Sequence, residues 1–230
     1  MYQTMRELLI GILMAIIIFG GLSLGLKDAQ LSPDKWFYSF KTAGEWLDVN
    51  LLTFGAVAKQ RKHLQFTDRR LEEFTAFFQA AESSRLPSKE KLKRLNRSYE
   101  KELASSYFMA EQLALIGPEY LGLLEDVYLT SLAHLEKLEK LAGTAAEAGG
   151  FAVSAQLYNS KAIKTLLQKH QYTPADTKRY QALVAKRLAW VESRQDRLSE
   201  AQLETLQKAK AVLAEGVEIE WAYDLLSSIR

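Results

Sequence analysis

The chain has 230 residues, and its 30 basic and 28 acidic side chains leave a formal net charge of +2. A charge so close to balance creates no strong field for nucleic acid or for an anionic membrane surface, and we expect no nucleic-acid partner. The absence of cysteine excludes disulfide bonds, thiolate catalysis and cysteine-rich zinc sites. Only 12 glycines and 4 prolines accompany 25% charged residues, a composition that favours an all-α fold.

The first predicted element is an apolar helix over residues 8–26. This stretch reads LLIGILMAIIIFGGLSLGL and contains no ionisable side chain. At about 1.5 Å per residue it spans roughly 28 Å, close to the hydrocarbon thickness of a bilayer. Inside lipid every backbone polar group must be bonded within its own segment, which requires a helix here. We therefore predict a transmembrane anchor that includes Leu8, Ile16, Phe19, Gly21, Gly25 and Leu26.

A short tail, residues 1–7, precedes this anchor and carries Arg6. Such a tail is typical of a signal anchor that leaves the following chain outside the cytoplasmic membrane. Lys27, Lys35 and Lys41 on the other side of the anchor favour the opposite orientation. We expect a single-pass protein of the cytoplasmic membrane with the bulk of the chain extracytoplasmic, and the reverse topology stays open.

Small residues of the anchor leave two further points open. Ser23 and Gly25 stand at offsets that suit a signal peptidase, but the apolar run is longer than most signal-peptide cores, so retention is favoured over cleavage. Gly21 and Gly25 form a GxxxG pattern through which two anchors can approach closely. A loosened helix end is the simpler interpretation of this pair, and a homo-oligomer stays an alternative.

An aromatic helix is predicted to begin at Ser32-Pro33-Asp34. A capping residue, a proline at the first helical position and an early acid occur together there. The aromatic residues of this helix either lie in the interfacial belt of the membrane or pack into the core, and core packing is the favoured use. They are Trp36, Phe37, Tyr38, Phe40 and Trp46.

A second, longer helix is predicted over residues 50–81. Its apolar residues recur mostly every seven positions and form a coiled-coil-like seam that faces other helices, made of Val57, Leu64, Leu71, Phe74 and Phe78. The other faces carry mixed charge, which we expect to be a solvated surface made of Lys59, Arg61, Lys62, Asp68, Arg69, Arg70, Glu72 and Glu73.

After the anchor come Pro33 and, at helical spacing, Tyr38, Lys41 and Glu45, followed by Lys59, Leu64 and the run Arg70-Leu71-Glu72-Glu73. With the anchor before them, they resemble an uncharacterised bacterial family of helical domains that follow an N-terminal anchor or signal. The resemblance covers roughly residues 30–142. It implies an extracytoplasmic helical module, and it brings no catalytic residues to this chain because the family has no established activity.

Two more helices are predicted before residue 142, one after Ser88 and one after Gly117-Pro118. Four consecutive helices with short connections predict an antiparallel bundle domain over residues 30–142. Residues 143–150 are small and glycine-rich, so they are predicted to form a linker or a long turn. We expect residues 151–230 to form a further helical C-terminal region, with capping boxes at Thr173 and Ser199.

No motif in the sequence specifies a reaction. His63, His134 and His170 lie on different predicted helices, and neither an HExxH nor an ExxH pair occurs. No glycine-rich loop follows a strand, which excludes the usual nucleotide sites. We therefore expect no catalytic residue, metal, cofactor or small-molecule substrate, and bundle acids such as Glu73 and Glu111 are expected to point outward.

The sequence favours a membrane-tethered helical domain that binds a protein partner or builds an assembly, because bundle surfaces offer apolar grooves and charged faces. The alternative is a sensory or regulatory module. It would signal through a partner membrane protein, since the tail of residues 1–7 is too short for an output domain. A hydrolase or metal enzyme with a site assembled across the bundle is the third hypothesis, which a reproducible metal content would support.

Overall fold

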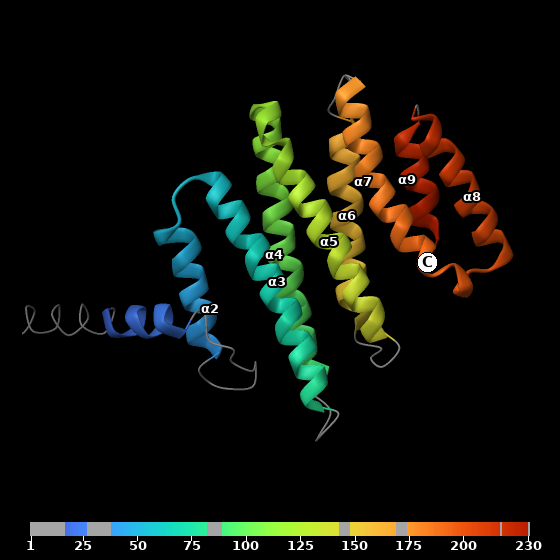
Figure 1. Ribbon diagram of the computed structural model, residues 1–230. Coiled ribbons are helices and arrows are strands. Elements are labelled where there is room, and N and C mark those ends of the chain that lie inside the picture. The colour runs from blue at the N-terminus through green and yellow to red at the C-terminus, as the bar shows by residue number, and fades with distance from the viewer. Residues whose placement is uncertain are drawn as a thin grey trace, which may run out of the picture. The chain divides into compact units, whose positions relative to one another are not determined.

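All regular secondary structure that the computed structural model describes is helical (Figure 1). The described residues are 17–26, 38–81, 89–142, 148–168, 174–216 and 218–229. Within these ranges there is no strand, which confirms the all-α fold class expected from the composition.

The chain divides into two compact units, residues 1–106 and 107–230. Unit 1 contains α2 (Tyr38–Leu47), the π-helical turn η1 (Asp48–Leu52), α3 (Ala56–Ala81) and the first part of α4 (Lys89–Ile116). Unit 2 contains the rest of α4, followed by η2 (Pro118–Tyr120), α5 (Leu121–Ala142), α6 (Ala148–Gln168), α7 (Pro174–Glu192), η3 (Gln195–Arg197), α8 (Glu200–Glu215) and α9 (Ile219–Ser228). Residues 143–147 of the predicted linker lie outside the described residues.

The described part of the apolar N-terminal stretch, residues 17–26, is helical. It packs on α2, where the ring centroids of Phe19 and Phe40 are 5.1 Å apart. Ser23 is buried, and its carbonyl group occupies the space that a side chain on Gly44 would need. Residues 8–16 of the predicted anchor lie outside the described residues. No helix among the described residues is long and apolar enough to cross a membrane.

The start of α3 differs from the prediction. A helix was expected from residue 50, but η1 continues from α2, and α3 begins at Ala56. Gly55 separates the two with a φ of 86°, a backbone conformation that glycine adopts without strain. Asn50 donates its side-chain amide to the carbonyl of Trp46 at 2.9 Å. Helix α3 therefore begins later in the chain than the prediction from its apolar residues placed it.

In unit 1, α3 and α4 run in opposite directions. Three contacts show this direction, since residues later in α3 meet residues earlier in α4: Gln60 contacts Ser106, His63 contacts Glu102 and Arg70 contacts Ser98. The predicted seam of α3 lies partly in the core: Leu64, Leu71 and Phe74 are buried, and Val57 and Phe78 are partly exposed.

In unit 2, α5 and α7 run in the same direction. Tyr128 of α5 donates to the carbonyl of Leu183 in α7, and Glu139 further along α5 pairs with Arg194, just past the end of α7. The helix ends follow the local sequence signals. Ser199 and Gln202 form the predicted capping box of α8, which ends at Gly216 with a φ of 72°.

Candidate functional site

A cluster of buried charged residues joins α2 to α3 in unit 1. We call it the ionic cluster, and its members are Tyr38, Lys41 and Glu45 of α2 with Arg70 and Glu73 of α3. The side chain of Arg70 is only 1% exposed, and that of Glu45 only 5%. Residues spaced three or four apart lie on one face of a helix, so each helix presents its part of the cluster to the other.

All three guanidinium nitrogens of Arg70 donate hydrogen bonds. Its Nη1 donates to Glu73 at 2.9 Å, its Nη2 pairs with Glu45, and its Nε donates to Ser98 Oγ of α4 at 2.8 Å. Lys41 also pairs with Glu73, and the hydroxyl of Tyr38 donates to the same carboxylate at 3.1 Å. Two cations therefore face two carboxylates, and the cluster is neutral overall.

Burial and ion pairing oppose each other in the ionic cluster, and the balance differs between its members. It raises the pKa of Glu45 above the ordinary value of 4.5, against the attraction of Arg70. Burial alone would lower the pKa of Arg70, but Glu45, Tyr38 and Glu73 together hold that pKa above its usual value. Burial also raises the pKa of Tyr38, so its phenol stays protonated and serves as a donor.

These contacts correct one expectation from the sequence. Arg70 and Glu73 were predicted to belong to a solvated surface, and that prediction is wrong because α2 covers them. Their polar atoms are bonded to residues of the same cluster and to Ser98 of α4. The ionic cluster therefore stabilises the packing of α2 against α3. Arg69 extends it with a contact to Glu45 at 3.5 Å.

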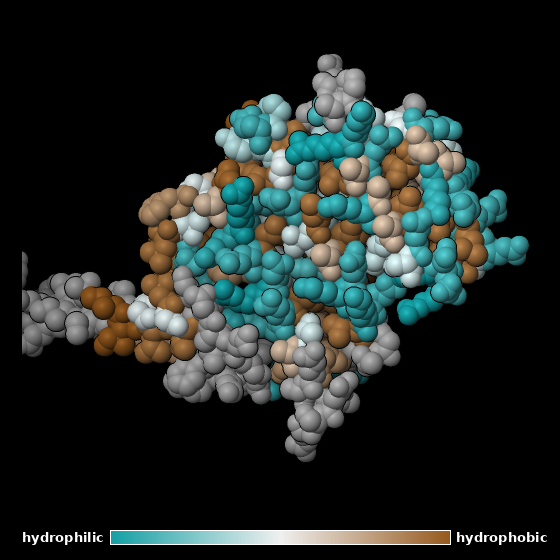
Figure 2. All heavy atoms as spheres, in the orientation of Figure 1, coloured by the Kyte–Doolittle hydropathy of each residue, from teal (hydrophilic) through white to brown (hydrophobic). Residues whose placement is uncertain are grey.

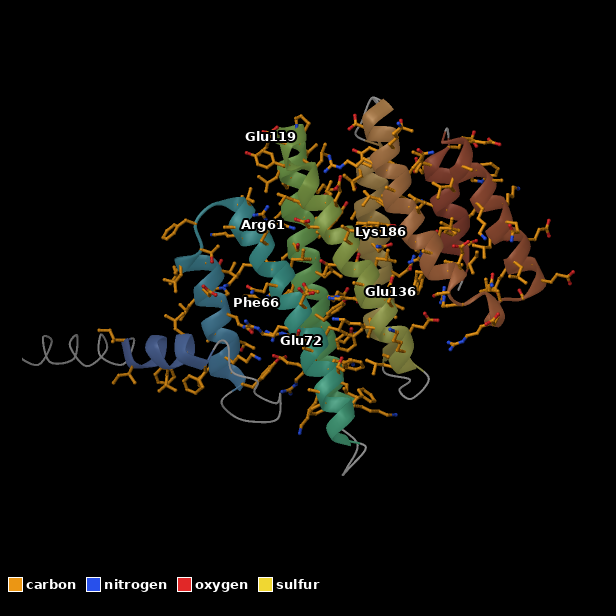
Figure 3. The ribbon with its side chains drawn as sticks, in the orientation of Figure 1. Arg61, Phe66, Glu72, Glu119, Glu136 and Lys186 are labelled. Carbon is orange, nitrogen blue, oxygen red and sulfur yellow. The ribbon has the colours of Figure 1, made fainter. Side chains whose placement is uncertain are left out.

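A groove of about 880 Å³ lies between α5 and α7 in unit 2. Its apolar lining comes from both helices and consists of Leu129, Leu132, Ala133, Ala189 and Trp190. Its charged lining consists of Glu136, Glu139 and Lys140 from α5, Lys186 from α7, and Arg194 and Arg197 beyond the end of α7. Figure 3 labels Glu136 and Lys186 on the two helices that form its walls. The groove thus combines an apolar surface with charges of both signs.

Trp190 is the largest apolar side chain of this groove, and two arginines hold its ring. The guanidinium carbon of Arg187 lies 4.3 Å from the ring centroid, and that of Arg194 lies 3.8 Å from it. Arg194 also donates to Glu139 at 3.0 Å. Among the described residues, the indole Nε1 of Trp190 and the Nε and Nη2 of Arg194 have no hydrogen-bond partner. The groove therefore presents an aromatic surface stacked on two guanidinium groups, while these unpartnered donors are themselves buried.

Arg187 lies behind Trp190 in a buried polar layer. It is 2% exposed, and its Nη2 donates to Gln156 of α6 at 2.8 Å. Within the described part of the chain, its Nε and Nη1 lack a hydrogen-bond partner. Burial lowers its pKa. In the same layer Asn159 bonds to the backbone of Tyr128 and to the hydroxyl of Tyr223. This layer differs from the ionic cluster, since its cation is not matched by a carboxylate in the described residues.

Residues 30–213 match the model of a protein family described as "Domain of unknown function (DUF5667)". The chain belongs to this family. The match confirms the resemblance to an uncharacterised domain family, and it extends well past residue 142, where the expected resemblance ended. No curated protein and no solved structure matches the chain. The DUF5667 match covers both the ionic cluster and the groove between α5 and α7.

The residues that carried the resemblance include the whole ionic cluster of this DUF5667 chain. Sequence reasoning named these residues but missed their burial. The signal that could have shown it is the spacing of Tyr38, Lys41 and Glu45, which places a hydroxyl, a cation and an acid on one face of a short helix.

The histidines of this DUF5667 chain do not form a metal site in the ranges that the structure describes, where no group of three potential ligands comes together. His63 contacts Glu102 at 2.6 Å, and His134 is buried. His170 lies outside the described residues. Of the predicted anchor residues, Phe19 is 60% exposed, and the space beside Gly21 and Gly25 is open.

Proposed function

We propose that this DUF5667 protein is a membrane-tethered helical module that stands outside the cytoplasmic membrane and binds a partner protein through the groove between α5 and α7. The observation that carries the proposal is the groove itself. It has an apolar lining formed by two helices and charged residues along its sides. Such a surface suits the apolar face of an amphipathic helix from a partner.

The dimensions and chemistry of the groove favour a protein over a small molecule. Its lining runs from Leu129 to Lys140 on α5, which is about 16 Å at 1.5 Å per residue. That length matches about three turns of a bound helix. Trp190 and Arg194 are of the residue types that contribute most to protein interfaces. Charges of both signs on the walls can set the direction of the bound helix.

The tether is the second part of the proposal. It is supported by the apolar sequence of residues 8–26, which contains no ionisable side chain. A tether restricts the module to the membrane surface, where a modest affinity suffices for partners in the same membrane.

The test is photo-crosslinking in native membranes from single positions of the full chain. A photoreactive side chain at Ala189 lies in the groove, and one at Ala201, an exposed residue of α8, serves as the matched control. We expect one recurrent protein adduct from Ala189 and none from Ala201. Trp190→Ala should reduce the adduct, because it removes the aromatic surface next to Ala189. Equal capture from both positions, or capture that does not change with Trp190→Ala, would refute the proposed site.

A further inference from the structure

The end of α2 and the turn into α3 expose four large apolar side chains. We call them the apolar turn: Trp46 is 57% exposed, Leu51 56%, Leu52 52% and Phe54 84%. Residues 49–58 contain no charged side chain. Figure 2 shows apolar side chains gathered at this end of unit 1. Large apolar side chains grouped in this way mark an interaction surface, whereas scattered ones do not.

The apolar turn is held in place by its neighbours and is not a displaced piece of core. Asp48 and Val49, which lie between Trp46 and Leu51, are buried. Lys62 of α3 pairs with Asp48 at 2.9 Å, and Asn50 bonds to the backbone of Trp46. The inward positions of η1 are therefore filled, so the apolar side chains face outward as part of the folded structure.

Basic residues follow the apolar turn directly. Lys59, Arg61 and Lys62 lie in the first two turns of α3, and Figure 3 labels Arg61 near the start of that helix. Between residues 46 and 67 the only acid is Asp48, which is buried and paired with Lys62. Within this segment the exposed charge is therefore positive, and the acid of α4 that lies near Trp46, Glu102, is paired with His63. Apolar side chains with cations next to them are typical of a surface that lies in the headgroup region of an anionic membrane.

The apolar turn is also close to the segment proposed as the tether. Residues 17–26 touch α2 at Phe40 and Gly44, and Trp46 follows Gly44 by about 3 Å along the helix. Tryptophan is enriched at the boundary between lipid and water. A bilayer that holds the proposed tether would thus lie close to α2, whose C-terminal end carries the apolar turn.

We infer that the apolar turn inserts into the lipid interface of the membrane that holds the tether, with Lys59 and Arg61 next to anionic headgroups. The inference rests on the proposed tether and goes beyond it. A tether alone lets unit 1 swing about one point, whereas a second contact at Trp46 and Phe54 fixes the orientation of α2 against the bilayer. The partner is a lipid surface, and cover by a second protein is the competing outcome.

The test uses the full chain, whose lack of cysteine allows labelling at single introduced cysteines. Phe54→Cys and, as a matched control on α3, the exposed position Glu72→Cys are labelled with an environment-sensitive NBD fluorophore. The labelled chains are reconstituted in vesicles of phosphatidylcholine with phosphatidylglycerol, some of which contain doxyl-labelled phosphatidylcholine as a quencher. Leu51→Cys provides a second position within the apolar turn, and circular dichroism checks that each variant keeps its helical content.

We expect blue-shifted emission at residues 54 and 51 and quenching by the doxyl lipid several times stronger than at residue 72. Lys59→Glu with Arg61→Glu should weaken this quenching in vesicles that contain phosphatidylglycerol. Quenching equal to that at residue 72 would overturn the inference. A blue shift without lipid quenching would do the same, because it would show that this chain or a second copy of it covers the apolar turn.

Alkaline extraction of the same membranes separates the two proposals. If the chain stays in the membrane pellet while residue 54 is not quenched, the tether holds and only the second contact is wrong. If extraction releases the chain, the tether itself is wrong, and this inference is overturned with it.

Discussion

Two arginines that are buried among the described residues, Arg70 and Arg187, provide a matched test of what holds each unit together. Arg70 is 1% exposed and Arg187 is 2% exposed, so both guanidinium groups have left water almost completely. Arg70 is paired with two carboxylates. Arg187 has a single hydrogen bond, to Gln156, and stacks on Trp190. Replacing each arginine by methionine keeps the length and apolar stem while removing the charge.

Arg70→Met should destabilise unit 1 by about 3–5 kcal/mol, because it leaves Glu45 and Glu73 buried without their main partner. Arg187→Met should leave unit 2 as stable as the original or more stable, by up to about 4 kcal/mol. The variant loses one hydrogen bond and one stacking contact, each of about 1 kcal/mol. It also removes two buried donors without partners, whose burial costs about 1–3 kcal/mol each.

Native-state hydrogen exchange with mass spectrometry measures both effects in the full chain, because it reports the opening free energy of each helix separately. Exchange in α3 reports on Arg70→Met, and exchange in α7 reports on Arg187→Met. A second variant that combines Arg70→Met with Glu45→Leu should regain part of the loss, since it removes one stranded carboxylate. The reasoning is refuted if the two single variants lose equal stability, or if Arg70→Met costs less than about 1 kcal/mol.

Three further predictions concern single positions. Gly44→Val should separate residues 17–26 from α2, because a side chain at this position meets the carbonyl of Ser23. Hydrogen exchange in α2 should therefore become faster. In the control variant Gly122→Ala, where the space is open, hydrogen exchange in α5 should be unchanged or slower. Burial raises the pKa of Glu45 above 4.5, so the folded chain holds a proton more tightly than the unfolded chain. The stability of unit 1 relative to Glu45→Gln should therefore be highest below pH 4.5 and fall as the pH rises through the folded pKa, and a rise in denaturant titrations across this range would contradict the assignment. Ser199→Ala should cost about 1 kcal/mol at the start of α8, seen as faster exchange in its first turn, and unchanged exchange would show that the capping box contributes little.

Helix ends could be predicted from the sequence because their causes are local. Gly117-Pro118 ends α4, Ser199 caps α8 and Gly216 ends α8 with a positive φ. The start of α3 was predicted too early, since the conformation of Gly55 overrides an apolar spacing that continues through it.

The ionic cluster could not be predicted because its energetics depend on residues far apart in the chain. Burying Arg70 is tolerable only when Glu45, on another helix, is buried beside it. Considered separately, Arg70 and Glu45 would each be predicted to lie at the surface. The exposure of Trp46 is the converse case, because core packing was expected for this aromatic residue and the structure leaves it 57% exposed.

The groove between α5 and α7 was also beyond prediction. Its lining residues lie on two helices separated by α6, and their spacing in the sequence does not fix the distance between them. The sequence indicated only that bundle surfaces offer grooves to partners. The position of Trp190 in the groove follows from how α7 packs on α5 and α6.

The most direct test of the groove compares crosslinks from its two walls. Photoreactive side chains at Ala133 of α5 and at Ala189 of α7 face the groove from opposite helices. If one amphipathic helix occupies the groove, both positions should crosslink in native membranes to the same short segment of the same partner, at residues about one turn apart. Adducts on unrelated proteins, or on distant segments of one protein, would contradict the proposal that the groove binds a partner helix.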